Sequence, residues 1–141
     1  MALICVDSNI VAKLLIPEDD SDIASDLWRN WARDGEVIVG PSLMSYEVTN
    51  ILRKAVTQGR TTVDASRRAL EGFFALSLTL FSGRWIHARA LPLALDHSIA
   101  SAYDAHYLAV ARELGATLWT ADRRLYEAAE ASATPARLFG S

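Results

Sequence analysis

The stretch "SAYDAHYLAVARELGATLWTADRRL", residues 101–125, decides the fold class because it contains a helix, a buried strand and a second helix in succession. Apolar residues recur at helical spacing up to Gly115, which ends the first helix, and "ATLWTA" (116–121) is typical of a strand in a parallel sheet. The first helix has one irregular position, because Asp104 lies on the apolar flank beside Tyr107. A carboxylate therefore stands where a core side chain is expected.

The same spacing divides the rest of this helix between two faces. Tyr103 and Tyr107 are one turn apart on the apolar face, so we expect both rings in the core. Ala105 and His106 fall on the opposite face and are expected in solvent. His106 then faces away from Asp104, and nothing in the pattern favours a catalytic histidine.

Strands and helices alternate along the chain, which predicts an α/β domain with a mostly parallel sheet of four to five strands. A length of 141 residues suits a single domain, 1–141. Residues 84–97 look helical but contain Pro92, where we expect a kink or a break. The expected strands are 2–6, 36–40, 77–81, 116–121 and a short last one at 136–140. The other expected helices are 8–16, 18–35, 41–59, 61–76, 101–114 and 122–131.

The composition is globular, with 51% apolar and 22% charged residues. A net charge of −3 is not the balance of a general nucleic-acid binder, unless several acids are gathered in one cation-binding site. Cys5 is the single cysteine, which excludes a disulfide framework and a thiolate metal cluster. The opening "MALICVDSNI" lacks a basic signal-peptide start, and no apolar run approaches the roughly 20 residues of a spanning helix. We therefore expect a cytoplasmic protein without membrane contact.

Four acids are placed so that they can meet at one edge of the sheet. Asp7 and Asp122 each end a strand, and the carboxyl ends of parallel strands share the edge where α/β proteins place their sites. Glu47 and Asp104 lean inward from helices. Four converging carboxylates repel one another, and a divalent cation relieves that repulsion. Oxygen ligands without nearby Cys or His favour Mg²⁺ or Mn²⁺ over Zn²⁺.

Each acid also has a simpler interpretation. Asp7 could cap the helix that follows it, and Asp122 could be a first-turn acid favoured by the helix dipole. Ser101 and Asp104 form a capping-box pattern. Glu47 could pair with a basic residue of its own helix. These interpretations do not explain why Asp104 shares a face with two tyrosines or why Glu47 leans inward.

Three blocks of the sequence resemble the PIN-domain ribonucleases, and more narrowly the VapC toxins of bacterial and archaeal toxin–antitoxin pairs. The blocks are "ICVDSNIVAKLL" (4–15), "PSLMSYEVTNILRKA" (41–55) and the stretch at 101–125. The third block is the most specific, because Y-D-A-x-Y-L-A-x-A is followed after a short gap by an apolar strand leading into T-A-D. The resemblance covers nearly the whole chain.

The resemblance implies a three-layer PIN-like α/β fold and a metal-dependent endoribonuclease using Mg²⁺ or Mn²⁺. It also implies an RNA substrate, a VapB-type antitoxin partner and a homodimer. Asp7 and Asp104 match the positions described as core metal ligands, and Thr120 matches a polar residue that supports the site, a role Asn9 could share. The full acidic quartet that the family would use is Asp7, Glu47, Asp104 and Asp122.

Further residues are candidates for contacts with RNA and with a partner. Arg123 and Arg124 adjoin Asp122 and, with Lys13, could bind RNA phosphates. The helix at 18–35 carries Leu27, Trp28 and Trp31, which could line a groove for the antitoxin, because tryptophan is enriched at interface hot spots. The alternative is that these large side chains belong to the core.

Two other functions compete with this interpretation. A haloacid-dehalogenase-like phosphatase also begins with a strand and an aspartate, but it requires D-x-D where this chain has "DSN" (7–9). The chain could instead be a PIN-like binding module that has lost catalysis. The complete set of four acids weighs against that possibility.

Overall fold

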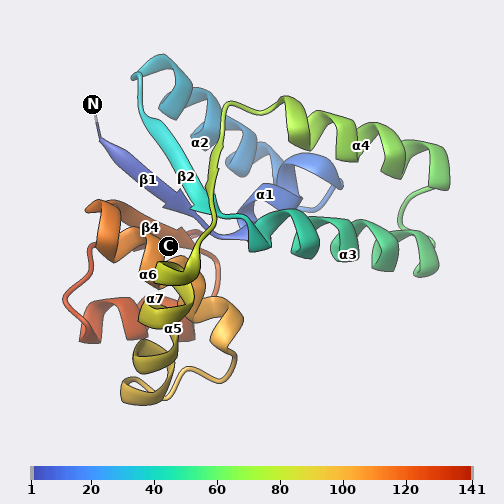
Figure 1. Ribbon diagram of the computed structural model, residues 1–141. Helices are drawn as coiled ribbons and strands as arrows, with labels where there is room; N and C mark the ends of the chain where they lie inside the picture. Colours follow the sequence, from blue (N-terminus) through green and yellow to red (C-terminus); the bar gives the residue numbers. More distant parts are fainter. Residues whose placement is uncertain (1, 141) are drawn as a thin grey trace.

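The computed structural model describes residues 2–140, and its centre is a sheet of five strands that all run parallel (Figure 1). The strand order across the sheet is β3-β2-β1-β4-β5, so β1 is central and β3 and β5 are the edges. The strands are β1 (Leu3–Val6), β2 (Val37–Pro41), β3 (Thr79–Phe81), β4 (Thr117–Thr120) and β5 (Ala136–Leu138).

Helices cover both faces of this sheet and complete three layers, as the sequence predicted. The first four helices form one group and the last three form another on the opposite side (Figure 1). The first group is α1 (Ser8–Leu15), α2 (Ser21–Arg33), α3 (Leu43–Thr57) and α4 (Val63–Ala75). The second group is α5 (Arg84–Asp96), α6 (Ala102–Leu114) and α7 (Arg123–Ala131). None of these helices within residues 2–140 combines the length and apolarity that crossing a membrane requires.

The core is built on β1, whose residues 4–6 are buried on both faces of the sheet. Burial on both sides explains the unbroken apolar run of this strand, because helices cover both faces of a parallel sheet. Cys5 is fully buried, and burial raises the pKa of its thiol, so it serves as a small core side chain.

Helix α6 departs from the amphipathic pattern expected of it. Ala105, predicted to face solvent, is fully buried because α5 packs against the side of α6 that faces away from the sheet. Tyr103, predicted in the core, is 62% exposed, whereas Tyr107 one turn later is fully buried. Tyr103 lies in the first turn, at the margin of the packed layers, where helical spacing alone no longer decides burial.

Pro92 does not break α5, which continues from Arg84 to Asp96. Proline has no N–H to donate to the carbonyl of Ala88, but both residues are exposed, so water can solvate that carbonyl. The opposite face of α5 is buried against the core through Ile86, Ala90 and Ala94. This packing holds the helix together across the proline.

Candidate functional site

The site forms at the centre of the sheet, where the order in which strands are added reverses. From β1 the chain builds outward to β2 and β3, and it later returns to place β4 on the other side of β1. Parallel pairing of β1 with β4 continues past the end of β1, because the Asp7 N–H donates to the Trp119 carbonyl at 2.9 Å. Asp7 therefore lies at the topological switch point, at the carboxyl end of the central strand, where open α/β sheets bind their ligands.

Asp7 is held by the end of the neighbouring strand. Asp7 is only 5% exposed. Thr120, the last residue of β4, donates its hydroxyl hydrogen to Asp7 Oδ2 at 2.7 Å. The same Thr120 oxygen accepts the backbone N–H of Asp122 at 3.0 Å. Thr120 thus links Asp7 to the start of α7, and the supporting role that the resemblance implies for it stays a prediction.

Glu47 reaches the same region from α3. Its Oε1 accepts the Tyr107 hydroxyl at 2.6 Å and the Ser8 hydroxyl at 3.2 Å. Ser8 also lies 3.5 Å from Asp7 Oδ1, so its hydroxyl stands between the two acids. Burial and the nearby Glu47 charge raise the pKa of Tyr107, which therefore keeps its proton and donates it. Neither Ser8 nor Tyr107 is among the site residues predicted from the sequence.

Asp104 completes the cluster from the first turn of α6. Among residues 2–140 its carboxylate has no hydrogen-bond donor, and its pKa is raised to about 6 by burial and by the charges of Asp122 and Glu47. These electrostatic couplings join an acid from each of α3, α6 and the start of α7. Asp104 is therefore aimed at the other acids and not at its own helix terminus.

The buried carboxylate of Asp7 has no compensating positive charge. Its pKa is raised to about 7, mainly by burial and further by the charges of Asp104 and Glu47, although the Thr120 hydrogen bond lowers it. No ion pair between residues 2 and 140 includes any of the four acids. A group this deeply buried is costly to ionise without a cation.

Comparison with known proteins identifies the family to which this arrangement belongs. Residues 4–131 match the PIN domain family. This chain belongs to the PIN-domain family. The PIN-domain chain is also 33% identical over 132 residues to Ribonuclease VapC3 of Pyrobaculum aerophilum, with 92% of this chain and 97% of that protein covered. This relative confirms the VapC-type resemblance found in the sequence.

Solved structures share the fold of this PIN domain. PAE2754 from Pyrobaculum aerophilum superposes with a TM-score of 0.68 at 23% identity, covering 90% of this chain and 84% of that one. VapBC-1 from nontypeable Haemophilus influenzae gives a TM-score of 0.69 at 14% identity, with 99% of both chains covered. At such identities the likeness shows the fold alone.

The capping roles considered for three of the acids are seen at Asp122 but not at Asp7 or Asp104. Asp7 occupies the N-cap position of α1, but its side chain makes no capping bond. Ser101 caps α6 through the N–H of Tyr103, without a returning bond from Asp104. Asp122 does cap α7, because its Oδ1 accepts the Arg124 N–H at 2.9 Å. For Asp122, capping and a role in the site are compatible.

The pairing suggested for Glu47 is wrong, because its hydrogen bonds go to Tyr107 and Ser8 and not to a basic residue of α3. Asn9 supports the edge of the site, since its Oδ1 accepts the Ala121 N–H at 3.3 Å. The hydrogen bonds to the acids thus come from neutral donors, namely the hydroxyls of Thr120, Ser8 and Tyr107 and the Arg124 N–H.

The basic residues predicted to bind RNA phosphates divide into two groups. Arg123 and Arg124 are exposed at the start of α7 and form no ion pair with the described residues. Lys13 is 15% exposed and is paired with Asp20 at 3.0 Å, with Glu18 at 3.9 Å. Lys13 therefore joins α1 to the loop before α2, while the two arginines are exposed at the start of α7, next to Asp122 in sequence.

The large apolar residues of α2 that were candidates for a partner groove lie in two different environments. Trp31 is a core residue that packs edge-on against Trp119, with ring centroids 5.4 Å apart, and Trp28 packs against Trp31. Leu27 instead lines a hollow of about 650 Å³ together with Ile23 and Trp119. The core interpretation thus holds for Trp31, whereas a partner groove at Leu27 stays a prediction.

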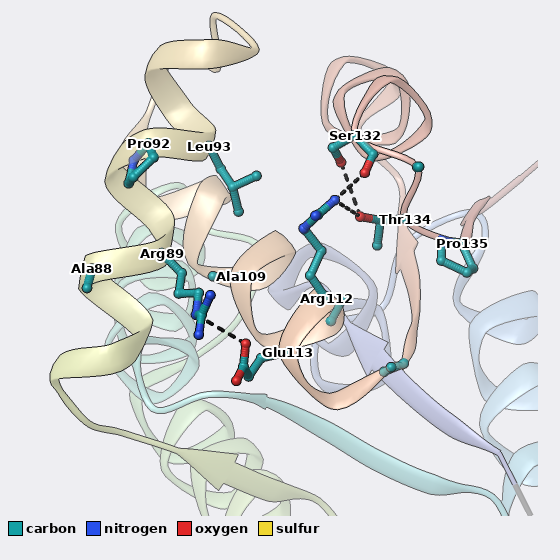
Figure 2. Close-up of a pocket in the computed structure, with 14 residues that line it drawn as sticks. Ala88, Arg89, Pro92, Leu93, Ala109, Arg112, Glu113, Ser132, Thr134 and Pro135 are labelled. Carbon is teal, nitrogen blue, oxygen red and sulfur yellow. Dashed lines mark hydrogen bonds and ion pairs between the residues drawn. The ribbon is translucent and has the colours of Figure 1, made fainter.

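A second hollow, of about 520 Å³, lies between the end of α6, α5 and the loop before β5 (Figure 2). Its charged groups are already matched. Arg89 pairs with Glu113 at 3.1 Å, and Arg112 donates to the Ser132 carbonyl and to Thr134. None of the four acids lines this hollow, so it is separate from the candidate site.

Oxygen donors alone make up the acidic cluster, which suits Mg²⁺ or Mn²⁺. Within residues 2–140 no three Asp, Glu, His or Cys side chains already stand in metal-binding geometry. The pKa values of Asp7 and Asp104 are nevertheless raised, first by burial and further by the neighbouring acids, and a bound cation would offset both costs. The residues present fit a divalent cation by their chemistry and burial.

The raised pKa of Asp7 predicts how stability depends on pH in metal-free protein. The folded state binds a proton at Asp7 up to about pH 7, whereas the unfolded chain loses it near 3.8, so stability falls as pH rises through that window. Asp7→Asn cannot ionise and should be more stable than wild type at pH 8 by about 2 to 4 kcal/mol. Near pH 4 this gain should vanish.

Urea unfolding in EDTA at both pH values measures the effect. Asp34→Asn is the matched control, because Asp34 is an exposed acid at the far end of α2, and it should shift stability by less than about 0.5 kcal/mol at either pH. An Asp7→Asn variant no more stable than wild type at pH 8 would contradict the electrostatic account of the site.

Proposed function

We propose that this PIN domain is a Mg²⁺- or Mn²⁺-dependent endoribonuclease. The observation that carries the proposal is the meeting of Asp7, Glu47 and Asp104, coupled by their charges and without a cationic partner. The name of the relative, Ribonuclease VapC3, supports RNA as the substrate. These acids and Asp122 would hold the cation, which when bound supplies an activated water and neutralises charge on the leaving oxygen.

The protein's own groups would then orient the site. Thr120 holds Oδ2 of Asp7, and the Ser8 hydroxyl lies 3.5 Å from its Oδ1. Asp104 has no hydrogen-bond donor among residues 2–140 and is free to turn toward a cation. Arg123 and Arg124 would bind RNA phosphates on either side of the bond to be cut. His106, two residues after Asp104, is hydrogen-bonded to the Ala102 carbonyl and to His87, so the proposal assigns it no role in cleavage.

The competing functions have less support. A phosphatase of the haloacid-dehalogenase type would use a second acid two residues after Asp7, and Asn9 there accepts a backbone N–H instead. An inactive binding module would not need to keep Asp7 buried and unneutralised. The cost of that burial is explained by a cation site.

Asp104→Asn should lower RNA cleavage at least about hundredfold, because removing one metal ligand forfeits several kcal/mol of charge stabilisation. The measurement is the cleavage rate of an end-labelled single-stranded RNA in Mg²⁺, in Mn²⁺ and in EDTA. Asp34→Asn, purified in parallel, is the control and should retain the wild-type rate. The Asp104→Asn preparation, purified in the same way, reports contaminating ribonuclease.

Cleavage that survives EDTA or Asp104→Asn would overturn the proposal. Hydrolysis of a phosphomonoester in place of RNA would favour the phosphatase. Failure of the wild-type chain to cut any RNA, with antitoxin binding retained, would favour the binding module.

We further propose that the chain is the toxin of a type II pair, is held by a VapB-type antitoxin, and forms a homodimer. The VapBC-1 structure of Haemophilus influenzae, which has the same fold, motivates the antitoxin. The hollow formed by Ile23, Leu27 and Trp119 is a suitable seat for an apolar antitoxin segment, because Ile23 is 58% exposed at its rim.

Ile23→Glu should weaken binding of the cognate antitoxin by at least about tenfold, the loss typical of an interface residue worth more than 1 kcal/mol. Calorimetric titration measures this, and RNA cleavage by the free toxin should be unchanged. Leu95→Glu is the control, since Leu95 is 72% exposed on α5, far from this hollow in the chain and outside its lining. Equal affinity for wild type and Ile23→Glu would place the antitoxin elsewhere.

A further inference from the structure

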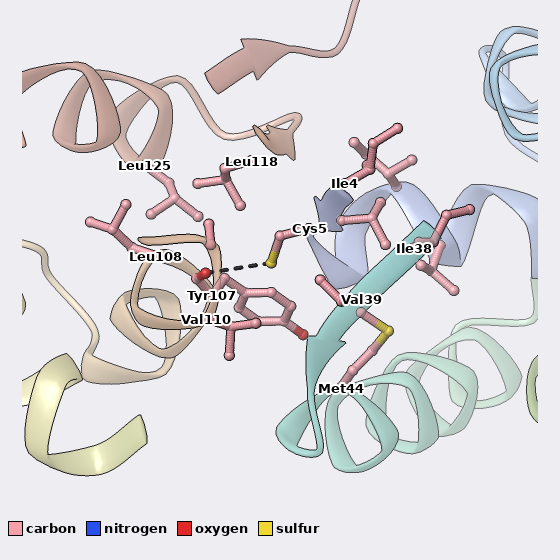
Figure 3. Close-up of a cluster of buried hydrophobic side chains, with 14 of the residues drawn as sticks. Ile4, Cys5, Ile38, Val39, Met44, Tyr107, Leu108, Val110, Leu118 and Leu125 are labelled. Atoms are coloured by element: carbon pink, nitrogen blue, oxygen red, sulfur yellow. Dashed lines mark hydrogen bonds between the residues drawn. The ribbon is translucent and has the colours of Figure 1, made fainter. Parts of the chain in front are cut away.

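Tyr107 is a core residue whose polar end reaches the acidic site. Its ring lies between α6 and β2, with the hydroxyl directed toward the start of α3 near Val39 and Met44 (Figure 3). The hydroxyl donates to Glu47 Oε1 across 60 positions of sequence, at 2.6 Å. A phenylalanine would fill the same apolar space, so the hydroxyl is the group that needs an explanation. A buried phenol requires a hydrogen-bond partner, and here the partner is one of the four acids.

Both donors to Glu47 converge on a single oxygen. Tyr107 and Ser8 each donate to Oε1, and within residues 2–140 no donor reaches Oε2. Two donors on one oxygen restrict rotation of the carboxylate about its terminal bond. Oε2 is then the Glu47 oxygen that is available to a ligand.

We propose that Tyr107 is a positioning residue that, together with Ser8, fixes Glu47 so that Oε2 faces the divalent cation. The inference rests on the proposed metal-dependent nuclease and adds a residue that the acidic quartet does not include. Groups that hydrogen-bond a metal ligand orient it, and their loss weakens metal affinity or activity by about 10- to 100-fold. Tyr107 would act through Glu47 and would not touch the RNA.

Tyr107→Phe keeps the ring and removes the hydroxyl. We expect the Mn²⁺ dissociation constant, measured by electron paramagnetic resonance of free Mn²⁺, to rise by about tenfold. We expect kcat for RNA cleavage to fall by a similar factor with KM within about twofold, because the RNA contacts are untouched. Tyr103→Phe is the matched control, since it removes an exposed hydroxyl from the same helix one turn earlier, and it should leave both quantities unchanged.

A double-variant cycle separates positioning from a general loss of structure. In a Glu47→Gln background, Tyr107→Phe should cause no further loss of Mn²⁺ affinity, because the oriented carboxylate is already gone. An equal loss in both backgrounds would overturn the inference. Ser8→Ala provides a second variant in case Tyr107→Phe does not fold, and it too should weaken Mn²⁺ binding in wild type and not in Glu47→Gln.

Failure of this inference can be told from failure of the proposed function. If Asp104→Asn abolishes Mn²⁺ binding while Tyr107→Phe binds Mn²⁺ as wild type does, the positioning role is wrong and the metal site stands. If Asp104→Asn binds Mn²⁺ as tightly as wild type, the metal site itself is wrong.

Discussion

The fold of this chain brings four carboxylates within electrostatic reach of one another, and no ion pair among residues 2–140 balances them. Asp7 bears most of the resulting cost, because it is buried at the end of the central strand and feels the charges of Asp104 and Glu47. Its pKa, raised to about 7, means that metal-free protein at neutral pH holds this group partly protonated. A divalent cation would displace that proton and convert mutual repulsion into shared coordination.

A chain of neutral hydrogen bonds holds these charges in position. It begins at the Asp122 N–H, passes through the Thr120 hydroxyl to Asp7, and continues across Ser8 to Glu47, where Tyr107 joins it from α6. The donors are hydroxyl and backbone N–H groups, which orient carboxylates without neutralising them. The site is thereby rigid and still negatively charged, which are the two properties that a binding site for a small, hard cation needs.

Much of this site could be predicted from the sequence. Asp7 and Asp122 follow apolar strands, and parallel strands have their carboxyl ends at one edge, so their meeting follows from local pattern and topology. Asp104 was informative because it broke an apolar stripe. The Glu47–Tyr107 bond could not be predicted in this way, since it joins residues distant in sequence and Tyr107 reads as an ordinary core residue. Ala105 and Tyr103 were misplaced because helical spacing does not show that α5 covers a second face of α6 or where the packed layers end.

The central claim is that Asp7 and Asp104 share one divalent cation. Anomalous diffraction from crystals grown with Mn²⁺ tests it directly, because the signal locates the metal independently of the protein's light atoms. The account predicts a peak within coordination distance of both the Asp7 and the Asp104 carboxylates, on the side of Glu47 where Oε2 lies. A fully occupied Mn²⁺ site elsewhere, with Asp7 and Asp104 left without metal, would contradict it.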